Sequence, residues 1–503
     1  MADLRKVRAR RNISTSLLYQ MITLLCGFVV PKLLLAAYGS EVYGATVSIA
    51  QFLSYITLLE GGIGGVARAA LYKPLAQKDH ATISAILTEI RGFFRVVAGI
   101  FIGYVILLAC SFKSFSGFTQ MDQFSTVLLV LAISISTFVQ YFFGISNSIL
   151  LQAAQRSYIT NLINVATMVI NTLATVVMVL LRCNIITVKL VSSTIFLVKP
   201  LVMWLYVSRH FHIAKHGKDG KKHLSQKWSG LGQHIAFFLH SNTDVVVLTC
   251  LASLQSVAVY SVYNMIVSHI QNLATSFVSG MEALFGDLLA RQEQAQLQDT
   301  FDIYEMMLSV VSLVLFSAVA VLILPFVKLY TAGVADANYQ EPLFAILLSL
   351  SALLYCLRMP YHSLVIAAGH FRQTRVAAYG EAGINIVLSV LLVVWIGLSG
   401  VAIGTICAVV FRFVYYAIYV SRNLLFRSIT LTVRRFLVNA ATLAIVVFFG
   451  SIVISRFPIF DYFDWIICGF IVVLLAVGFT VIVNFIFYRK VFVAMIGSIF
   501  KKW

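Results

Sequence analysis

The stretch GSEVYGATVSIAQFLSYITLLEGGIGGVAR, residues 39–68, decides the fold class and supplies the first candidate site. After a short polar turn it continues for about 25 mostly apolar residues, enough to cross a bilayer as a helix. Glu60 lies inside this run, and Gly64 and Arg68 follow at helical spacing, so the three residues share one face. An ionisable residue at membrane depth is costly and commonly functional. The stretch therefore predicts a membrane span with a polar face, not a plain anchor.

The composition of the chain is that of a polytopic membrane protein. Of 503 residues, 60% are hydrophobic and 11% are charged, and the mean hydropathy is +0.93. Soluble chains carry about a quarter charged residues. The continuous apolar runs of ~20 residues favour helices over the short alternating strands of a barrel. We therefore predict an all-α protein.

About fourteen segments are long enough to span the membrane, by the ~20-residue rule. We place them at residues 13–37, 43–67, 92–112, 124–149, 157–181, 185–208, 229–254, 256–281, 303–327, 341–366, 374–397, 400–424, 434–456 and 464–487. The basic N-terminus runs straight into the first span with no small-residue cleavage site, so we expect that span to be retained.

The distribution of basic residues predicts the orientation of these spans. They gather in the N-terminus, in the tail 488–503 and in connections after even-numbered spans, such as 209–228. The opposite side has few bases, mainly Lys113, Arg182, Lys189, Lys328 and Arg456. By the positive-inside rule both termini are cytoplasmic. This topology explains the net charge of +18 better than binding to nucleic acid would.

No sequence pattern indicates a metal site or a catalytic centre. The seven cysteines lie mostly in apolar spans without a C-x-x-C pair, and the four histidines of the loop 210–228 are better explained as part of a solvated basic linker. Walker A, H-E-x-x-H, G-x-S-x-G and kinase motifs do not occur in the sequence. We predict that the protein is not an enzyme and has no resident metal or cofactor.

The basic loop divides the chain into two similar halves. Residues 153–181 align with 367–395, which places Ile170-Asn171 opposite Ile384-Asn385, and residues 41–44 resemble 258–261. Six spans separate the copies, so the repeat is parallel, with its axis along the membrane normal. The predicted domains are a six-helix bundle at 1–208, a cytoplasmic linker at 209–228, a second six-helix bundle at 229–425, and two extra spans with a basic tail at 426–503.

Two motifs resemble a known family. Residues 39–71 are similar to the second span of O-antigen and capsule repeat-unit flippases, and Asn242-Thr243-Asp244 with 251–266 resembles the start of their second half. These flippases belong to the multidrug/oligosaccharidyl-lipid/polysaccharide exporter superfamily. The resemblance implies a multi-pass protein of a bacterial or archaeal plasma membrane that translocates undecaprenyl-pyrophosphate-linked oligosaccharides by alternating access. It also implies cooperation with a polysaccharide polymerase and chain-length machinery.

Such a protein needs cations at membrane depth to bind a pyrophosphate. The candidates are Lys32, Lys199, Arg358 and Arg412, of which Lys199 and Arg412 lie nearest mid-span. An interhelical salt bridge is the alternative for each, and Arg358 with Glu381 is the clearest such pair. Lys32 also suits a position where its amine reaches the outer surface, and Lys199 precedes Pro200, where a helix kink frees a carbonyl.

Buried acids are candidates for coupling transport to a proton or sodium gradient. Asp244 lies mid-span with His240 one turn earlier on the same face, and a carboxylate beside an imidazole can exchange protons. The alternative is that Asp244 bonds locally to Asn242 or Thr243. Glu60 is the third candidate, with Arg68 as its nearest charged neighbour.

Three other functions compete with this interpretation. A relative with another cargo would move lipid II, a teichoic-acid precursor or drugs, although two extra C-terminal spans argue against the twelve-span drug exporters. A membrane polymerase or glycosyltransferase would need a large outer loop with catalytic groups, and the predicted outer loops are short. A scaffold without transport would not need so many buried charges.

Overall fold

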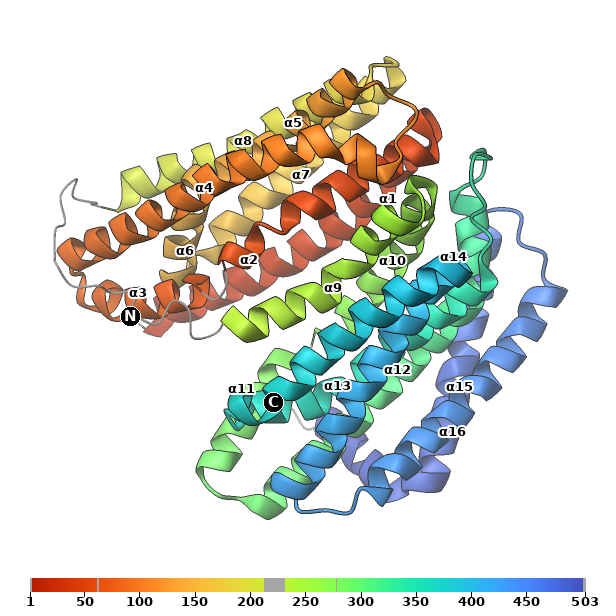
Figure 1. Ribbon diagram of the computed structural model, residues 1–503. Helices are drawn as coiled ribbons and strands as arrows, with labels where there is room; N and C mark the ends of the chain where they lie inside the picture. Colours follow the sequence, from red (N-terminus) through yellow and green to blue (C-terminus); the bar gives the residue numbers. More distant parts are fainter. Residues whose placement is uncertain (1, 61–62, 212–230, 277, 501–503) are drawn as a thin grey trace. The chain divides into compact units, whose positions relative to one another are not determined.

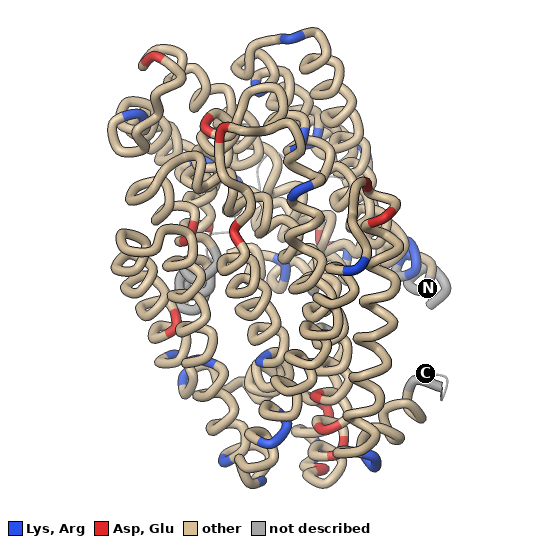
Figure 2. Tube along the Cα trace, turned by 90° about the vertical axis from the view of Figure 1, so that its right-hand side faces the viewer, with Lys and Arg blue, Asp and Glu red and all other residues tan. Residues whose placement is uncertain are grey.

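The computed structural model describes residues 2–60, 63–211, 231–276 and 278–500. Within these ranges all regular secondary structure is helical, which confirms the predicted fold class. Helices are expected here because hydrocarbon offers no hydrogen-bond partner to peptide groups, and a helix pairs them internally. Figure 2 shows long stretches of the chain that carry no charged residue, as membrane spans require.

The chain forms two compact units, which are described separately (Figure 1). Unit 1 comprises Met1–Phe238 and Ser253–Ala258. Its helices are α1 (Ala2–Ser54), α2 (Thr57–Glu60), α3 (Ile63–Gln77), α4 (His80–Ser116), α5 (Gln123–Val139), the π-helix η1 (Gln140–Gly144), α6 (Ile145–Ala153), α7 (Ser157–Leu180) and α8 (Ile185–His210).

Unit 2 comprises Leu239–Ala252 and Val259–Trp503. Two helices begin in unit 1 and continue into unit 2, namely α9 (Leu231–Leu251) and α10 (Leu254–Thr275). The others are α11 (Val278–Ala290), α12 (Gln294–Tyr330), α13 (Pro342–Ala367), α14 (Phe371–Asn423), α15 (Thr430–Arg456) and α16 (Tyr462–Phe500). The predicted domain limits stay a prediction, because residues 212–230 of the linker lie outside the described residues.

The described helices account for the predicted number of spans. Eleven segments are long and apolar enough to cross a membrane. Two of them hold two spans each, since α1 is interrupted at Gly39 (φ 79°) and α14 at Gly397 (φ 56°), backbone angles that favour glycine. The 21-residue helix α9 adds one more. Counted in this way, the described part of this multi-pass membrane protein contains fourteen candidate spans.

Aspartates outside the spans define where two helices begin. Asp79 precedes α4 and accepts a hydrogen bond from the Thr82 amide at 3.0 Å, and Asp122 caps α5 in the same way. Such caps pair amides that have no partner within the helix. The hydrogen bonds from the Thr82 side chain and amide also hold the pKa of Asp79 below its usual value.

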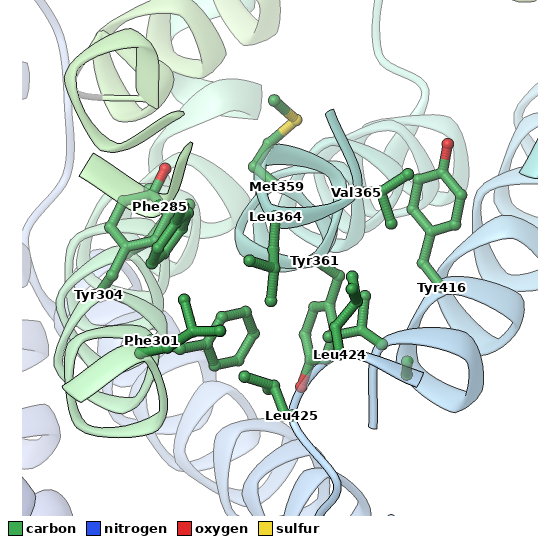
Figure 3. Packing of buried hydrophobic residues seen from close by; sticks show 14 of the residues in the cluster. Phe285, Phe301, Tyr304, Met359, Tyr361, Leu364, Val365, Tyr416, Leu424 and Leu425 are labelled. Carbon is green, nitrogen blue, oxygen red and sulfur yellow. The ribbon is translucent and has the colours of Figure 1, made fainter. Parts of the chain in front are cut away.

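Unit 2 has an aromatic core between α11, α12, α13 and α14 (Figure 3). Phe301 and Tyr361 meet edge to face, with ring centroids 5.2 Å apart, a favourable geometry for aromatic pairs. Phe285 and Tyr304 pack on the same side as Phe301. This packing joins the helices that carry the buried charges discussed below.

An ion-pair network fastens α15 to α12. Arg427, in the loop before α15, lies 2.5 Å from Asp302 and 3.0 Å from Glu305, and Arg435 of α15 lies 3.0 Å from Asp302. Arg435 also pairs with Glu305, which accepts a hydrogen bond from Tyr361. The sequence did not reveal this network, because its acids and bases come from distant parts of the chain.

Labelling of single cysteines tests the predicted orientation. Ser428 and Phe460 are both exposed and lie at opposite ends of α15. In a background without the seven native cysteines, Phe460→Cys should react with a membrane-impermeant maleimide in intact cells, and Ser428→Cys only after permeabilisation. Reaction of both residues in intact cells would contradict cytoplasmic termini.

Candidate functional site

A polar cavity of about 600 Å³ lies within unit 1, among spans two, four and six. Its polar lining consists of Ser54, Thr57, Glu60, Arg68, Ser136, Thr137, Gln140, Tyr141, Ser148, Gln152 and Lys199. The volume falls in the range of about 300–1,000 Å³ that is usual for ligand sites. Two candidates from the sequence, Glu60 and Lys199, therefore line one cavity, together with Arg68.

The interruption of span two shapes one wall of this cavity. Helix α1 ends at Ser54, a turn follows, α2 covers Thr57–Glu60, and α3 begins at Ile63. Glu60 and Gly64 face each other, because a Cβ added to Gly64 would lie 3.8 Å from a Glu60 carboxylate oxygen. Glu60, Gly64 and Arg68 all line the cavity, so the shared face that their spacing predicted is present.

Neighbouring side chains orient the two charged groups of this wall. Arg68 donates to the side-chain oxygen of Gln152 at 2.6 Å. The Tyr141 hydroxyl donates to the Glu60 carboxylate. Gln152 is neutral, so its hydrogen bond directs the guanidinium without cancelling its charge.

The π-helix η1 also contributes to the cavity lining. A π turn inside an α-helix is rare and frequently marks a functional site, because it shifts side chains out of helical register. Gln140 and Tyr141 of this turn both line the cavity. A Cβ on Gly144 would lie 2.8 Å from the Gln140 side-chain oxygen and 3.3 Å from Pro200, so glycine permits the close approach of η1 to α8.

Lys199 lies on α8 and lines the cavity in a half-buried position. Among the described residues it has no hydrogen-bond or ion-pair partner. Hydrocarbon penalises a cation that nothing compensates, so Lys199 is suited to bind an anionic ligand. Lys32, in α1, is half-buried and is not among the residues that line this cavity.

Arg358 and Arg412 belong to a different site, inside unit 2. Both donate to Glu381, one to each carboxylate oxygen, and all three side chains are buried. Arg412 also donates to the Tyr416 hydroxyl at 2.9 Å, and His362 stacks on the Tyr416 ring. The Arg358–Glu381 pair expected from the sequence is therefore present, with Arg412 as a third member. The one carboxylate of Glu381 pairs with both cations, whereas their role toward a ligand stays a prediction.

Asp244 is the centre of a buried polar cluster in unit 2. It accepts from Tyr260 at 2.9 Å and from Thr405 at 3.3 Å, and Asn385 donates to Thr405 at 3.1 Å. The side-chain amide oxygen of Asn385 (Oδ1) is buried without a hydrogen-bond partner among the described residues. The contacts of Asp244 thus reach α10 and α14, beyond the local bonds we considered. His240 lies in α9, but its side chain is outside the described residues.

Sequence reasoning missed several residues of these two sites. Gln140, Tyr141 and Gln152 were not singled out, although Gln140 and Gln152 are amides in or beside an apolar run, a signal that could have been used. Tyr260 was noted only as an aromatic. The alignment of the two halves singled out Asn385, but only the tertiary structure shows that it lies close to Asp244.

No protein-family model and no curated protein sequence matches the chain. Solved structures do. The lipid II flippase MurJ, in an inward closed conformation, superposes with a TM-score of 0.69 at 15% identity over 95% of this chain and 99% of its own. The MATE multidrug transporter DinF-BH superposes with a TM-score of 0.61 at 16% identity, over 84% of this chain and 97% of its own. A MATE transporter of Vibrio cholerae superposes with a TM-score of 0.51 at 15% identity, over 84% of this chain and 99% of its own.

These similarities define the class of fold. The chain has the helical fold of the lipid II flippase MurJ and of the MATE multidrug transporter DinF-BH. At 15–16% identity the comparison concerns the fold alone.

The Arg358–Glu381–Arg412 cluster predicts an asymmetric response to mutation. Removal of Glu381 leaves two buried guanidinium groups without a counter-charge, whereas removal of one arginine leaves a neutral pair. Breaking a buried ion pair costs about 3–5 kcal/mol. Glu381→Gln should therefore lower the melting temperature of the detergent-solubilised protein more than Arg358→Met or Arg412→Met does.

Arg291→Met is the control, because it breaks an exposed pair with Asp287, and such pairs contribute little. The double variant Arg358→Ala/Glu381→Ala should not recover full stability, since Arg412 remains unpaired. Equal melting temperatures for Glu381→Gln and wild type would show that the cluster does not stabilise the fold.

Proposed function

We propose that the protein is a flippase that moves undecaprenyl-pyrophosphate-linked oligosaccharide units from the cytoplasmic to the outer leaflet by alternating access. The observation that carries this proposal is the polar cavity of unit 1, which lies among apolar membrane helices and is lined by Lys199, a cation with no ion-pair or hydrogen-bond partner among the described residues. Packing among apolar helices alone would not require a lysine at this position.

The chemistry of the cavity suits a phosphorylated glycan. Lys199 supplies a point charge for a phosphate, and Arg68, already directed by Gln152, supplies a planar set of donors. Ser, Thr and Gln side chains can exchange hydrogen bonds with sugar hydroxyls, and the rings of Tyr141 and Phe196 offer flat apolar faces. A purely apolar cargo would leave these groups unpaired.

We assign ion coupling to Asp244. Its cluster presents a buried carboxylate to hydroxyl and amide groups, without an ion pair among the described residues. A buried carboxylate is stabilised when a proton or a sodium ion arrives, and Asn385 has a carbonyl oxygen to contribute. Glu60, in the headgroup cavity, is the second coupling candidate. A gradient of either ion would then bias the alternating conformations.

A second cargo, lipid II, is favoured by one observation. The MurJ structure matches 95% of this chain, whereas each of the two MATE structures matches 84%. Lipid II is a lipid-linked sugar, so it needs the same cations and hydroxyl groups. The two lipid-linked cargoes are to be compared directly, with drug export as the more distant alternative.

The setting follows from this function. The protein would act in a bacterial or archaeal plasma membrane with both termini in the cytoplasm, without enzymatic activity of its own. It would pass its cargo to a polysaccharide polymerase and chain-length machinery on the outer side.

Transport by purified protein in liposomes tests the headgroup site. Lys199→Gln and Arg68→Gln should each slow translocation of the undecaprenyl-pyrophosphate-linked oligosaccharide by about tenfold or more, the effect of one charge-assisted hydrogen bond. Lys199→Arg should retain partial transport because the charge is kept. Lys73→Gln is the control, since Lys73 is an exposed cation of α3 outside the cavity.

Lipid II in parallel liposomes identifies the cargo. If the wild-type protein translocated lipid II faster than the oligosaccharide, lipid II would be assigned as the cargo. Unchanged transport of both by Lys199→Gln and Arg68→Gln, at matched protein levels, would rule out the cavity as the headgroup site.

Ion coupling has a separate test in the same liposomes. Asp244→Asn removes the charge while keeping the hydrogen-bonding shape, so transport should no longer respond to an imposed sodium or pH gradient. Asp287→Asn, an exposed carboxylate of α11, should leave the response intact. A gradient response retained by Asp244→Asn would place the coupling elsewhere, with Glu60→Gln as the next variant.

A further inference from the structure

A second cavity, of about 460 Å³, lies within unit 2 among α12, α13 and α15. Its walls are mainly aliphatic, with Leu324, Ile346, Val447, Ile454 and Ile459 among them. It shares no lining residue with the polar cavity of unit 1 or with the Asp244 cluster. Neither the headgroup nor the coupling ion of the proposed function explains it.

The sequence accounts for the presence of a groove at this level. Beside the groove, α12 and α15 are in close contact, because a Cβ on Gly450 would lie 2.9 Å from a methyl group of Val321, which itself lines the groove. One turn further along α12, Pro325 cannot donate a backbone hydrogen bond and its ring crowds the preceding turn. The small residues Ala320 and Ser451 then leave space between the helices that larger side chains would fill.

The groove is accessible from the surface of unit 2. Ile346 is 52% exposed, and Ser451, on the opposite wall, is also exposed. Both residues lie within membrane-spanning helices, so hydrocarbon chains and not water surround this surface. An apolar groove in such a place is most stable when a hydrocarbon chain fills it.

One end of the groove carries a single charge. Lys328, in the last turn of α12, is the only ionisable residue in its lining and is exposed. Among the described residues it has no ion-pair or hydrogen-bond partner. Helix α12 ends two residues later, at Tyr330, so the amine lies at the level where lipid headgroups begin.

We propose that this groove binds one acyl chain of an anionic glycerophospholipid, with the lipid phosphate on Lys328. The aliphatic walls select hydrocarbon, and the lone cation at the mouth selects a headgroup with net negative charge. The neutral side chain of Gln340, which also lines the groove, can donate to phosphate or glycerol oxygens. The bound lipid would fill the gap between α15 and the helices of the second bundle and would stabilise their contact.

Native mass spectrometry of the full-length detergent-solubilised protein tests this site. The probes are phosphatidylglycerol and phosphatidylcholine with identical acyl chains. Wild-type protein should retain one phosphatidylglycerol with about tenfold preference over phosphatidylcholine, the effect of one charge-assisted contact. Lys328→Gln should abolish the preference, and Lys328→Arg should keep it.

The chain offers a matched pair of variants for the groove itself. Ser451 and Ser455 lie one turn apart on α15, both are exposed, and both donate to a carbonyl three residues earlier at 2.8 Å, but only Ser451 lines the groove. Ser451→Trp should therefore displace both lipids, while Ser455→Trp should displace neither.

Three results would overturn the proposal. The first is equal retention of the two lipids by wild-type protein, and the second is unchanged phosphatidylglycerol binding by Ser451→Trp. The third is displacement of phosphatidylglycerol by an equimolar polyprenyl phosphate, which would make the groove a site for the cargo tail. None of these measurements requires transport activity, so failure here leaves the proposed function untouched.

Discussion

Hydrocarbon offers no hydrogen-bond partner to a peptide group and little solvation to a charge, and most features of this protein follow from that constraint. It explains why the regular structure of the described chain is helical. A break in a membrane helix leaves peptide groups without partners, so each interruption needs a physical reason. The interruption of span two between Ser54 and Thr57 and the π turn at Gln140–Gly144 both border the polar cavity of unit 1. Irregular backbone is tolerated where it lines a cavity, and here it does so twice.

The same constraint separates the buried cations into two groups. Arg358 and Arg412 share Glu381, and Arg427 and Arg435 share Asp302 and Glu305. In these clusters the counter-charge belongs to the fold, so the arginines stabilise the packing of helices. Lys199 has no such partner among the described residues, and its compensation is expected from a ligand. This contrast, more than the presence of charge, distinguishes a binding site from a structural cluster.

The amino acids alone establish the helical fold, the number of spans and the presence of buried polar groups in spans two, six and seven. These are properties of short segments, namely the length of an apolar run and the spacing of residues along one helix, and no distant contact alters them. The tertiary structure decides which charges meet. Arg412 and Lys199 are alike in sequence as mid-span cations, but Arg412 pairs with Glu381 in the preceding span of α14, whereas Lys199 lines a cavity. Asn385 and Thr405 reach Asp244 because α14 packs beside α9, and side-chain partners between separate helices depend on rotation and depth, which a single sequence does not encode locally.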